Sequence, residues 1–420
     1  MSMPKKYVKV NGIMKLNPEY KKWKEAQSSK PATTVLNSSQ ALPIVSSMED
    51  YEKINDDIGA VQMSESTAAT IEMIQEPEIA LESGLQPDAM VDELGKMLAK
   101  YEIPIGLVNK VMALSEFESL EFIIDDSGSM QLSTDTIDPR TRQYMTRWEE
   151  SRIRLKEMIE VLAYVPFNQI GVEFLNRKQR IILKKQGRTP QAFLKEAYSD
   201  IDSCFVNGPA GTTPAYEKLQ ESFLRGQGHS IARYFFGDGQ PNGGRTAVDA
   251  IVKMLVRRAN PEQNPITFIS CTNEDEAVEW MKDCEEIAPF CSESDDFRDE
   301  AKEVLKDQGM ALPFSKGFHL ICQLVAAMNP YDLDAMDECI PFTKFTLDNL
   351  LGYQSNGDTY RHYFEGFREA QRRRPIEGPM DEIRKHTKWN YESFLMATGT
   401  FRSIPQAAEV QRRLKVVSGH

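Results

Sequence analysis

Cysteine and histidine are scarce in this chain of 420 residues, which contains six cysteines and five histidines. No two cysteines form a Cys-x-x-Cys pair and no HExxH sequence occurs, so the spacing describes neither a disulfide framework nor a zinc-enzyme motif. We therefore expect free thiols in a reducing compartment, which is the cytoplasm, with the nucleus as the alternative. The thiols expected to be free are Cys204, Cys271, Cys284, Cys291, Cys322 and Cys339.

Long apolar runs are also missing. The longest candidate, residues 318–328, falls short of the roughly 18 residues needed to cross a bilayer, so we expect no transmembrane segment. The positively charged N-terminus has no apolar stretch behind it and is not typical of a secretory signal. A net charge of -13 argues against nonspecific nucleic-acid binding, which needs basic surface to neutralise phosphates.

Composition divides the chain into four parts. Residues 1–86 begin with a lysine-rich stretch and continue as a polar, weakly periodic segment, for which we expect a disordered arm and linker. Residues 87–116 carry apolar residues at helical spacing and form an expected helical lead-in. Residues 117–330 alternate apolar runs with amphipathic stretches and include an expected acidic insertion near 285–300. Residues 331–420 are expected to form a C-terminal helical extension.

The alternation within 117–330 predicts an α/β fold with a doubly wound, mainly parallel sheet. Expected strands cover 120–124, 170–174, 180–183, 231–236 and 266–270. Expected helices cover 148–162, 190–198, 216–223, 247–257, 277–284 and 318–328.

Candidate metal ligands follow the first expected strand, where the sequence reads Asp125-Asp126-Ser127-Gly128-Ser129. One carboxylate and two hydroxyls in a tight loop are hard oxygen donors, which suit Mg²⁺, Mn²⁺ or Ca²⁺ better than zinc. The alternative is that Ser127 or Ser129 only caps the next helix.

Two later loops carry matching donors. Thr213 follows the glycine turn at Gly211, and Asp238 lies between Gly237 and Gly239 at the end of an apolar strand. In an open α/β sheet, loops after parallel strands meet at the carboxyl edge, where such folds bind ligands.

The ordered set Asp125, Ser127, Ser129, Thr213 and Asp238 resembles the metal-ion-dependent adhesion site of the von Willebrand factor type A family. The resemblance covers roughly residues 117–330. It implies one bound Mg²⁺, or Mn²⁺ or Ca²⁺, and a protein partner whose Glu or Asp completes the coordination of the ion. It also implies direct ligation by Ser127 and Ser129, while Thr213 and Asp238 alternate between direct and water-bridged contact.

We therefore expect an intracellular, metal-dependent protein-interaction module rather than an enzyme. Two alternatives remain open: a metal-assisted hydrolase, and a structural scaffold that acts through its helical flanks and tail. Asp126 is expected to add acidity at the surface beside the ion. Because loop carboxylates often face solvent, Asp238→Ala is expected to weaken ion binding and leave the fold intact.

Overall fold

The computed structural model describes residues 7–10, 13–16, 87–185, 187–272, 274–328, 336, 340–373 and 390–399. The chain separates into two compact units, residues 1–76 and 77–420. Most of the expected arm 1–86 and Cys339 lie outside the described residues.

The described part of the first unit is a β-hairpin. Strand β1 (Tyr7–Val10) pairs antiparallel with β2 (Ile13–Leu16), and Tyr7 lies opposite Leu16. Asn11-Gly12 between the strands is a dipeptide that favours two-residue hairpin turns. The sequence analysis expected no ordered structure here, because the polar composition of the whole segment outweighed this local signal.

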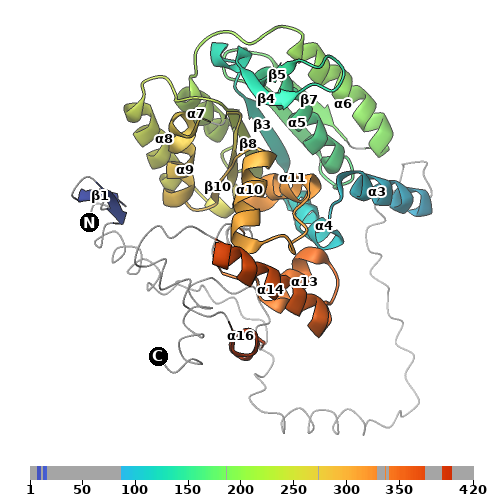
Figure 1. The fold of residues 1–420 in the computed structure, drawn as a ribbon. Helices are drawn as coiled ribbons and strands as arrows, with labels where there is room; N and C mark the ends of the chain where they lie inside the picture. Colours follow the sequence, from blue (N-terminus) through green and yellow to red (C-terminus); the bar gives the residue numbers. More distant parts are fainter. Residues whose placement is uncertain are drawn as a thin grey trace, which may run out of the picture. The chain divides into compact units, whose positions relative to one another are not determined.

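The second unit contains a mostly parallel six-stranded sheet in the order β10-β9-β8-β3-β6-β7 (Figure 1). Only β7 at one edge pairs antiparallel. The strands of this sheet are β3 (Ser119–Ile124), β6 (Gln169–Phe174), β7 (Arg180–Lys184), β8 (Ile231–Gly237), β9 (Ile266–Ser270) and β10 (Cys291–Ser294). A separate antiparallel hairpin consists of β4 (Ser133–Ile137) and β5 (Tyr144–Thr146).

Helices account for most of the remaining described residues. Those of the lead-in and the sheet region are α3 (Pro87–Tyr101), α4 (Ile105–Met112), α5 (Arg147–Leu162), α6 (Pro190–Phe205), α7 (Ala215–Arg225), α8 (Arg245–Arg257), α9 (Asp275–Ile287), α10 (Phe297–Gln308) and α11 (Lys316–Val325). Those that follow are α13 (Lys344–Leu351), α14 (Gly357–Arg373) and α16 (Tyr391–Thr398). No helix in the described part of the chain combines the length and apolar character required to cross a membrane.

Side chains of the central strands alternate between two hydrophobic clusters, one on each face of the sheet. Phe122 and Phe236 belong to the cluster shared with α5 and α6, whereas Ile123 and Phe235 belong to the cluster shared with α7, α8 and α9. Figure 1 shows these two groups of helices on opposite sides of the sheet. Burial on both faces explains why the strands are continuous apolar runs in the sequence.

The expected strands and helices of residues 117–330 are present, and most extend by one to a few residues beyond the predicted bounds. The expected acidic insertion differs from the structure: residues 291–294 form edge strand β10, and α10 begins at Phe297. The strand is short and carries serine and glutamate among its four residues, so its hydrophobic pattern was too weak to reveal it.

The lead-in and the helices after residue 340 share the core of the sheet. The larger hydrophobic cluster includes Leu107 of α4, Phe318 of α11, Leu350 of α13 and Phe364 of α14. Two glycines allow close backbone contacts: a methyl group at Gly317 would overlap the carbonyl oxygen of Tyr101, and one at Gly106 would overlap that of Asn349. The flanks are therefore packed directly onto the sheet domain.

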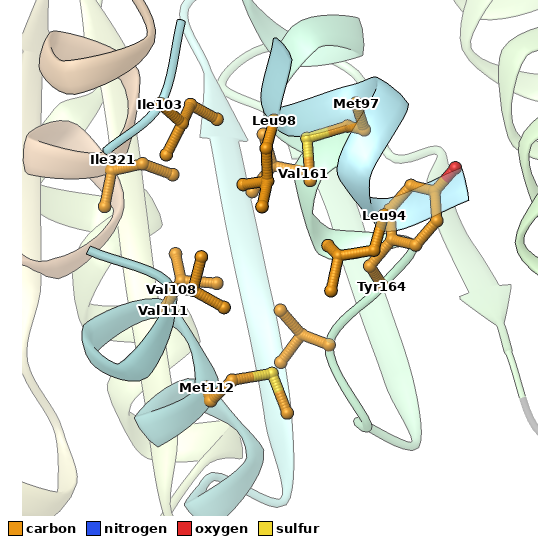
Figure 2. Close-up of a pocket in the computed structure, with 11 residues that line it drawn as sticks. Leu94, Met97, Leu98, Ile103, Val108, Val111, Met112, Val161, Tyr164 and Ile321 are labelled. Carbon is orange, nitrogen blue, oxygen red and sulfur yellow. The ribbon is translucent and has the colours of Figure 1, made fainter. Parts of the chain in front are cut away.

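A small apolar cavity lies where the lead-in meets the sheet domain. Its accessible volume is about 10 Å³, which is room for about one water molecule. Figure 2 shows that side chains from α3, α4, α5 and α11 converge on it, among them Leu98, Val111, Val161 and Ile321. A cavity of this size with apolar walls is a packing gap and not a ligand site.

Helix α7 is joined to the sheet by buried ion pairs. Glu121 of β3 and Glu173 of β6 are both buried. Both form ion pairs with Arg225, whose Nη2 lies 2.5 Å from Glu121 Oε1 and 2.6 Å from Glu173 Oε1. Arg233 Nε lies 3.3 Å from Glu121, and Lys218 Nζ lies 3.4 Å from Glu173. Cations of α7 and β8 thereby compensate Glu121, and two cations of α7 compensate Glu173.

A second group of buried polar side chains lies between β10, α10 and α11. His319 is buried, and its Nε2 lies 3.2 Å from the carbonyl oxygen of Asp295 and 3.3 Å from Ser294 Oγ. Burial lowers the pKa of His319 to about 3. Burial also raises the pKa of Glu300 to about 7, and the charges of Asp295 and Glu303 act in the same direction.

Gly317→Ala and Gly106→Ala should each lower the free energy of unfolding by about 1–3 kcal/mol or more, because the new methyl group requires backbone displacement. Gly95→Ala is the matched control: Gly95 is an exposed helical glycine with open space around its Cα, so its replacement should stabilise by about 0.5–1 kcal/mol. Urea unfolding measures all three. Equal effects at the three positions would contradict the close packing of the flanks.

Glu300→Gln should change how stability depends on pH. The folded pKa of Glu300 lies above its ordinary value of 4.5, so its contribution is complete below about pH 4.5 and is lost as pH rises to about 7. Above pH 7 the glutamine variant should be more stable than wild type by about 1–3 kcal/mol, and the difference should vanish near pH 4.5. Denaturant unfolding across this range, with exposed Glu279→Gln as control, tests the expectation.

Candidate functional site

The predicted loops meet at the carboxyl edge of the sheet. Asp125 is one residue beyond β3 and Asp238 is one residue beyond β8, which are neighbouring parallel strands. The ladder between them continues into the loop, because the amide of Asp125 donates to the carbonyl oxygen of Phe236 at 2.9 Å. The backbone pairing itself therefore fixes the separation of the two aspartates.

Four of the five predicted ligands form a continuous chain of polar groups. The amide of Ser127 donates to Asp125 Oδ1 at 2.8 Å, and the hydroxyls of Ser127 and Ser129 lie 3.0 Å apart. Ser129 Oγ then donates to Asp238 Oδ1 at 2.8 Å. Two aspartates that lie far apart in the sequence are thus linked through the amide and hydroxyl of Ser127 and the hydroxyl of Ser129.

Asp125 is the least compensated member of this chain. It is fully buried, its Oδ2 has no hydrogen-bond partner within the described structure, and no described cation forms an ion pair with it. Burial raises the pKa of Asp125 to about 7, and the nearby charges of Asp238 and Asp126 act in the same direction. A buried carboxylate oxygen without a partner costs free energy, so it calls for a proton or a cation.

Thr213 reaches the same edge, although no described hydrogen bond joins its hydroxyl to the other four ligands. The amide of Gly128 donates to Gly211 O at 3.2 Å, and the amide of Ala210 donates to Asp126 O at 2.8 Å. Gly211 has φ +114, a left-handed value, and a side chain there would overlap Asn176. The turn that delivers Thr213 therefore requires glycine.

Asp238 is engaged by an arginine that the sequence analysis did not identify. Arg147 Nη1 lies 2.9 Å from Asp238 Oδ2, and Arg147 Nη2 lies 2.8 Å from Glu274 Oε1. Asp238 is only 2 % exposed, so the expectation that it faces solvent is wrong. Asp238→Ala would leave Arg147 buried without its main partner and should destabilise the fold, contrary to the initial expectation.

Asp126 also differs from expectation. Its side chain is 1 % exposed and does not add acidity at the surface. Asp126 Oδ1 accepts hydrogen bonds from the amide and the side chain of Asn176, at 2.8 and 3.1 Å. Asp126 Oδ2 accepts no hydrogen bond within the described structure, but Arg177 Nε lies 3.1 Å from it as an ion-pair partner. Asn176 Nδ2 also donates to Thr212 O at 2.8 Å, so this carboxylate joins the loop after β6 to the other two loops.

Two sequence signals pointed to these partners. Arg147 opens helix α5 directly after its cap Thr146, where a cation is disfavoured by the helix dipole and therefore needs a local acid. Asn176 and Arg177 follow β6, which borders β3 and ends at the same edge.

The donor set at this edge consists of two carboxylates, Asp125 and Asp238, and hydroxyl groups. No cluster of three or more His, Cys, Asp or Glu side chains arranged for a metal ion occurs among the described residues. Such clusters typify zinc and iron sites, whereas hydroxyl and carboxylate oxygens suit hard divalent cations. The unpartnered Asp125 Oδ2 is consistent with such a cation.

Comparisons with known proteins give limited similarity. No family model and no curated protein matches the chain. Among solved structures, the PilB minor pilin from Streptococcus sanguinis aligns with a TM-score of 0.33 and 11 % identity, over 42 % of this chain and 56 % of that one. A point mutant of the same pilin aligns with a TM-score of 0.34 and 10 % identity, over 50 % and 62 %.

The conserved hypothetical protein BatB from Bacteroides thetaiotaomicron aligns with a TM-score of 0.24 and 15 % identity, over 36 % of this chain and 65 % of that one. The aligned region thus spans less than two thirds of each of these three chains. At these scores the similarities carry no argument about function, which must come from the residues of the site.

Proposed function

We propose that this chain is a metal-dependent protein-recognition module. Asp125, Ser127, Ser129, Thr213 and Asp238 would hold one divalent cation, Mg²⁺ or Mn²⁺, at the carboxyl edge of the sheet. When bound, the cation offers an exchangeable coordination position to a carboxylate of a partner protein.

One observation carries the proposal: the buried Oδ2 of Asp125 has no described partner, and its side chain stands at one end of the chain of polar groups that runs to Asp238. Of the three buried aspartates at this edge, Asp126 and Asp238 each have an arginine partner, and Asp125 has none in the described structure. A divalent cation would supply the missing positive charge and satisfy the oxygen at once.

The protein residues have distinct roles in this proposal. Asp125 supplies the uncompensated charge, and the serine hydroxyls supply neutral donors. Because Arg147 shares the charge of Asp238, the protein would donate little negative charge to the ion. An ion held in this way retains attraction for an incoming carboxylate, which favours recognition of acidic partners.

The strand order supports a type A arrangement. Consecutive strands run from β3 outward to β6 and β7, and the chain then returns to β8 on the other side of β3 before continuing to β9 and β10. Open α/β sheets bind ligands where the strand order reverses in this way. We infer that the domain is doubly wound, with the metal site at this reversal point.

Asp125→Asn should reduce Mn²⁺ affinity at least about tenfold, because the amide keeps the shape and removes the charge. The apo variant should be at least as stable as wild type, because it no longer buries an uncompensated carboxylate. Calorimetric titration with Mn²⁺ and urea unfolding measure the two effects, and Glu217→Gln, an exposed carboxylate on α7, is the control.

The recognition half of the proposal has its own measurement. Proteins captured from a lysate in Mg²⁺ should be released by EDTA and should not be captured by Asp125→Asn. Equal Mn²⁺ affinity for wild type and Asp125→Asn would refute the metal site. Unchanged capture in EDTA would instead support a scaffold.

Arg147→Met should destabilise the apo protein by about 3–5 kcal/mol, because it leaves Asp238 buried and unpaired. The same change should raise Mn²⁺ affinity, since Asp238 no longer shares its charge with a cation of the protein. Mn²⁺ should therefore raise the melting temperature of this variant more than that of wild type. Arg152→Met, on the same helix and paired with Asp202 instead, should change neither quantity. Lower Mn²⁺ affinity in Arg147→Met would contradict the assigned role.

A further inference from the structure

The two edges of the six-stranded sheet differ in how they are covered. At one edge, Cys291, Ser292 and Ser294 of β10 are buried. At the other edge, Arg180 and Lys184 of β7 are exposed, and β7 pairs with β6 alone among the described strands. Within the described structure, the β7 edge is therefore the open edge of the sheet.

The register shows which backbone groups of β7 point away from the sheet. The amide of Lys185, directly after β7, donates to Asn168 O at 3.4 Å, which continues the pairing of β7 with β6. In an antiparallel ladder, alternate residues bond to the partner strand and the residues between them point away. The backbone groups of Arg180, Ile182 and Lys184 therefore point outward, and none of them has a hydrogen-bond partner among the described residues.

Positive charge gathers along this edge. Lys178, Arg180, Lys184 and Lys185 lie within a stretch that contains no acidic residue. Glu121 is the one described carboxylate that pairs with any of them, through Arg180 at 3.3 Å, and it also pairs with arginines of α7 and β8. Burial lowers the pKa of Lys185 to about 8, and no carboxylate opposes this shift. The three lysines therefore have no carboxylate partner in the described structure, although the chain carries a net charge of -13.

The charges of β7 discriminate between possible partner strands. Lysine on an edge strand ordinarily keeps other chains from pairing with it. This applies to a second copy of the chain, because antiparallel pairing of β7 with itself about Ile182 would place Arg180 opposite Lys184. It does not apply to an acidic strand, since opposite charges on facing residues stabilise a strand pair and like charges destabilise it.

We propose that β7 accepts an extended acidic segment of a partner protein as an added strand. The backbone of the segment bonds to the outward groups of Arg180, Ile182 and Lys184. Acidic side chains of the segment lie opposite Arg180 and Lys184, which are four residues apart, and an apolar side chain lies opposite the half-buried Ile182. The partner motif is therefore an acid, any residue, an apolar residue, any residue and a second acid. The edge needs no metal ion, so the proposal is independent of the proposed function.

The test uses the full chain and a fluorescein-labelled peptide, Ser-Glu-Thr-Val-Thr-Glu-Ser, with fluorescence anisotropy as the measurement. Binding should saturate, should be the same in EDTA as in Mn²⁺, and should be absent for the peptide with both Glu replaced by Lys. Lys184→Glu should weaken binding at least about fivefold, because it replaces an attractive cross-strand pair with a repulsive one. Lys195→Glu is the control, since Lys195 is an exposed lysine of α6 without a described ion pair.

Hydrogen exchange at single-residue resolution separates strand addition from general charge attraction. In the free protein, the amides of Arg180, Ile182 and Lys184 should exchange faster than those of Ile181 and Leu183, which bond to β6. The peptide should slow exchange of the three outward amides at least about tenfold. Ile182→Pro removes the central outward amide at an edge position where proline is tolerated, and it should abolish peptide binding. Ile182→Ala keeps the amide and should still bind.

Each contrary outcome has a definite meaning. No saturable binding, or equal effects of Lys184→Glu and Lys195→Glu, would overturn the proposal. Binding without slower exchange of the outward amides would show charge attraction alone and would also overturn it. Slow exchange of these amides in the free protein would show that another part of this chain covers the edge, and binding lost in EDTA would place the peptide at the metal loop. Either result would overturn the role of β7. Loss of Mn²⁺ binding would refute only the proposed function.

Discussion

The parallel pairing of β3 with β8 brings Asp125 and Asp238 to one edge of the sheet, where burial excludes water from both. Carboxylates in such surroundings require protons or cations, because the interior solvates charge poorly. The other polar side chains at this edge supply hydrogen bonds and positive charge to these carboxylates and to Asp126. Two serines relay hydrogen bonds between the aspartates, and Arg147 and Arg177 approach from different elements.

The negative charges of the three aspartates are unequally compensated. Arg147 pairs with Asp238 and Arg177 pairs with Asp126, whereas Asp125 has hydrogen bonds alone. A site with every charge paired would have no reason to bind a cation, and a site with none paired would be difficult to fold. The same arginine also joins the site to the hairpin, because the amide of Arg147 bonds to Leu132 O while its side chain bonds to Asp238. The candidate metal loop and the β4–β5 hairpin are thus held together by hydrogen bonds.

Sequence reasoning succeeded where burial dictates composition. The runs that became β3 and β8 are apolar because both of their faces are covered, and the glycine and aspartate positions mark where the strands end. It failed where pairing depends on distant partners. Strand β4 reads Ser-Thr-Asp-Thr-Ile, which is too polar to indicate a strand, and Arg147 gains meaning only once β8 is placed beside β3. Buried acids such as Asp126 resemble surface acids until their partners are known.

The buried ion pairs of α7 also affect the loop that precedes this helix. Two apolar surfaces can shift against each other at little cost, but Arg225 and Lys218 of α7 form ion pairs with Glu121 and Glu173 at defined positions. A shift of α7 along its axis would leave these buried charges unpaired. The helix therefore has a single favourable register. Thr213 lies two residues before α7 begins, so the fixed position of α7 limits where Thr213 can lie at the sheet edge, and the loop loses conformational entropy during folding.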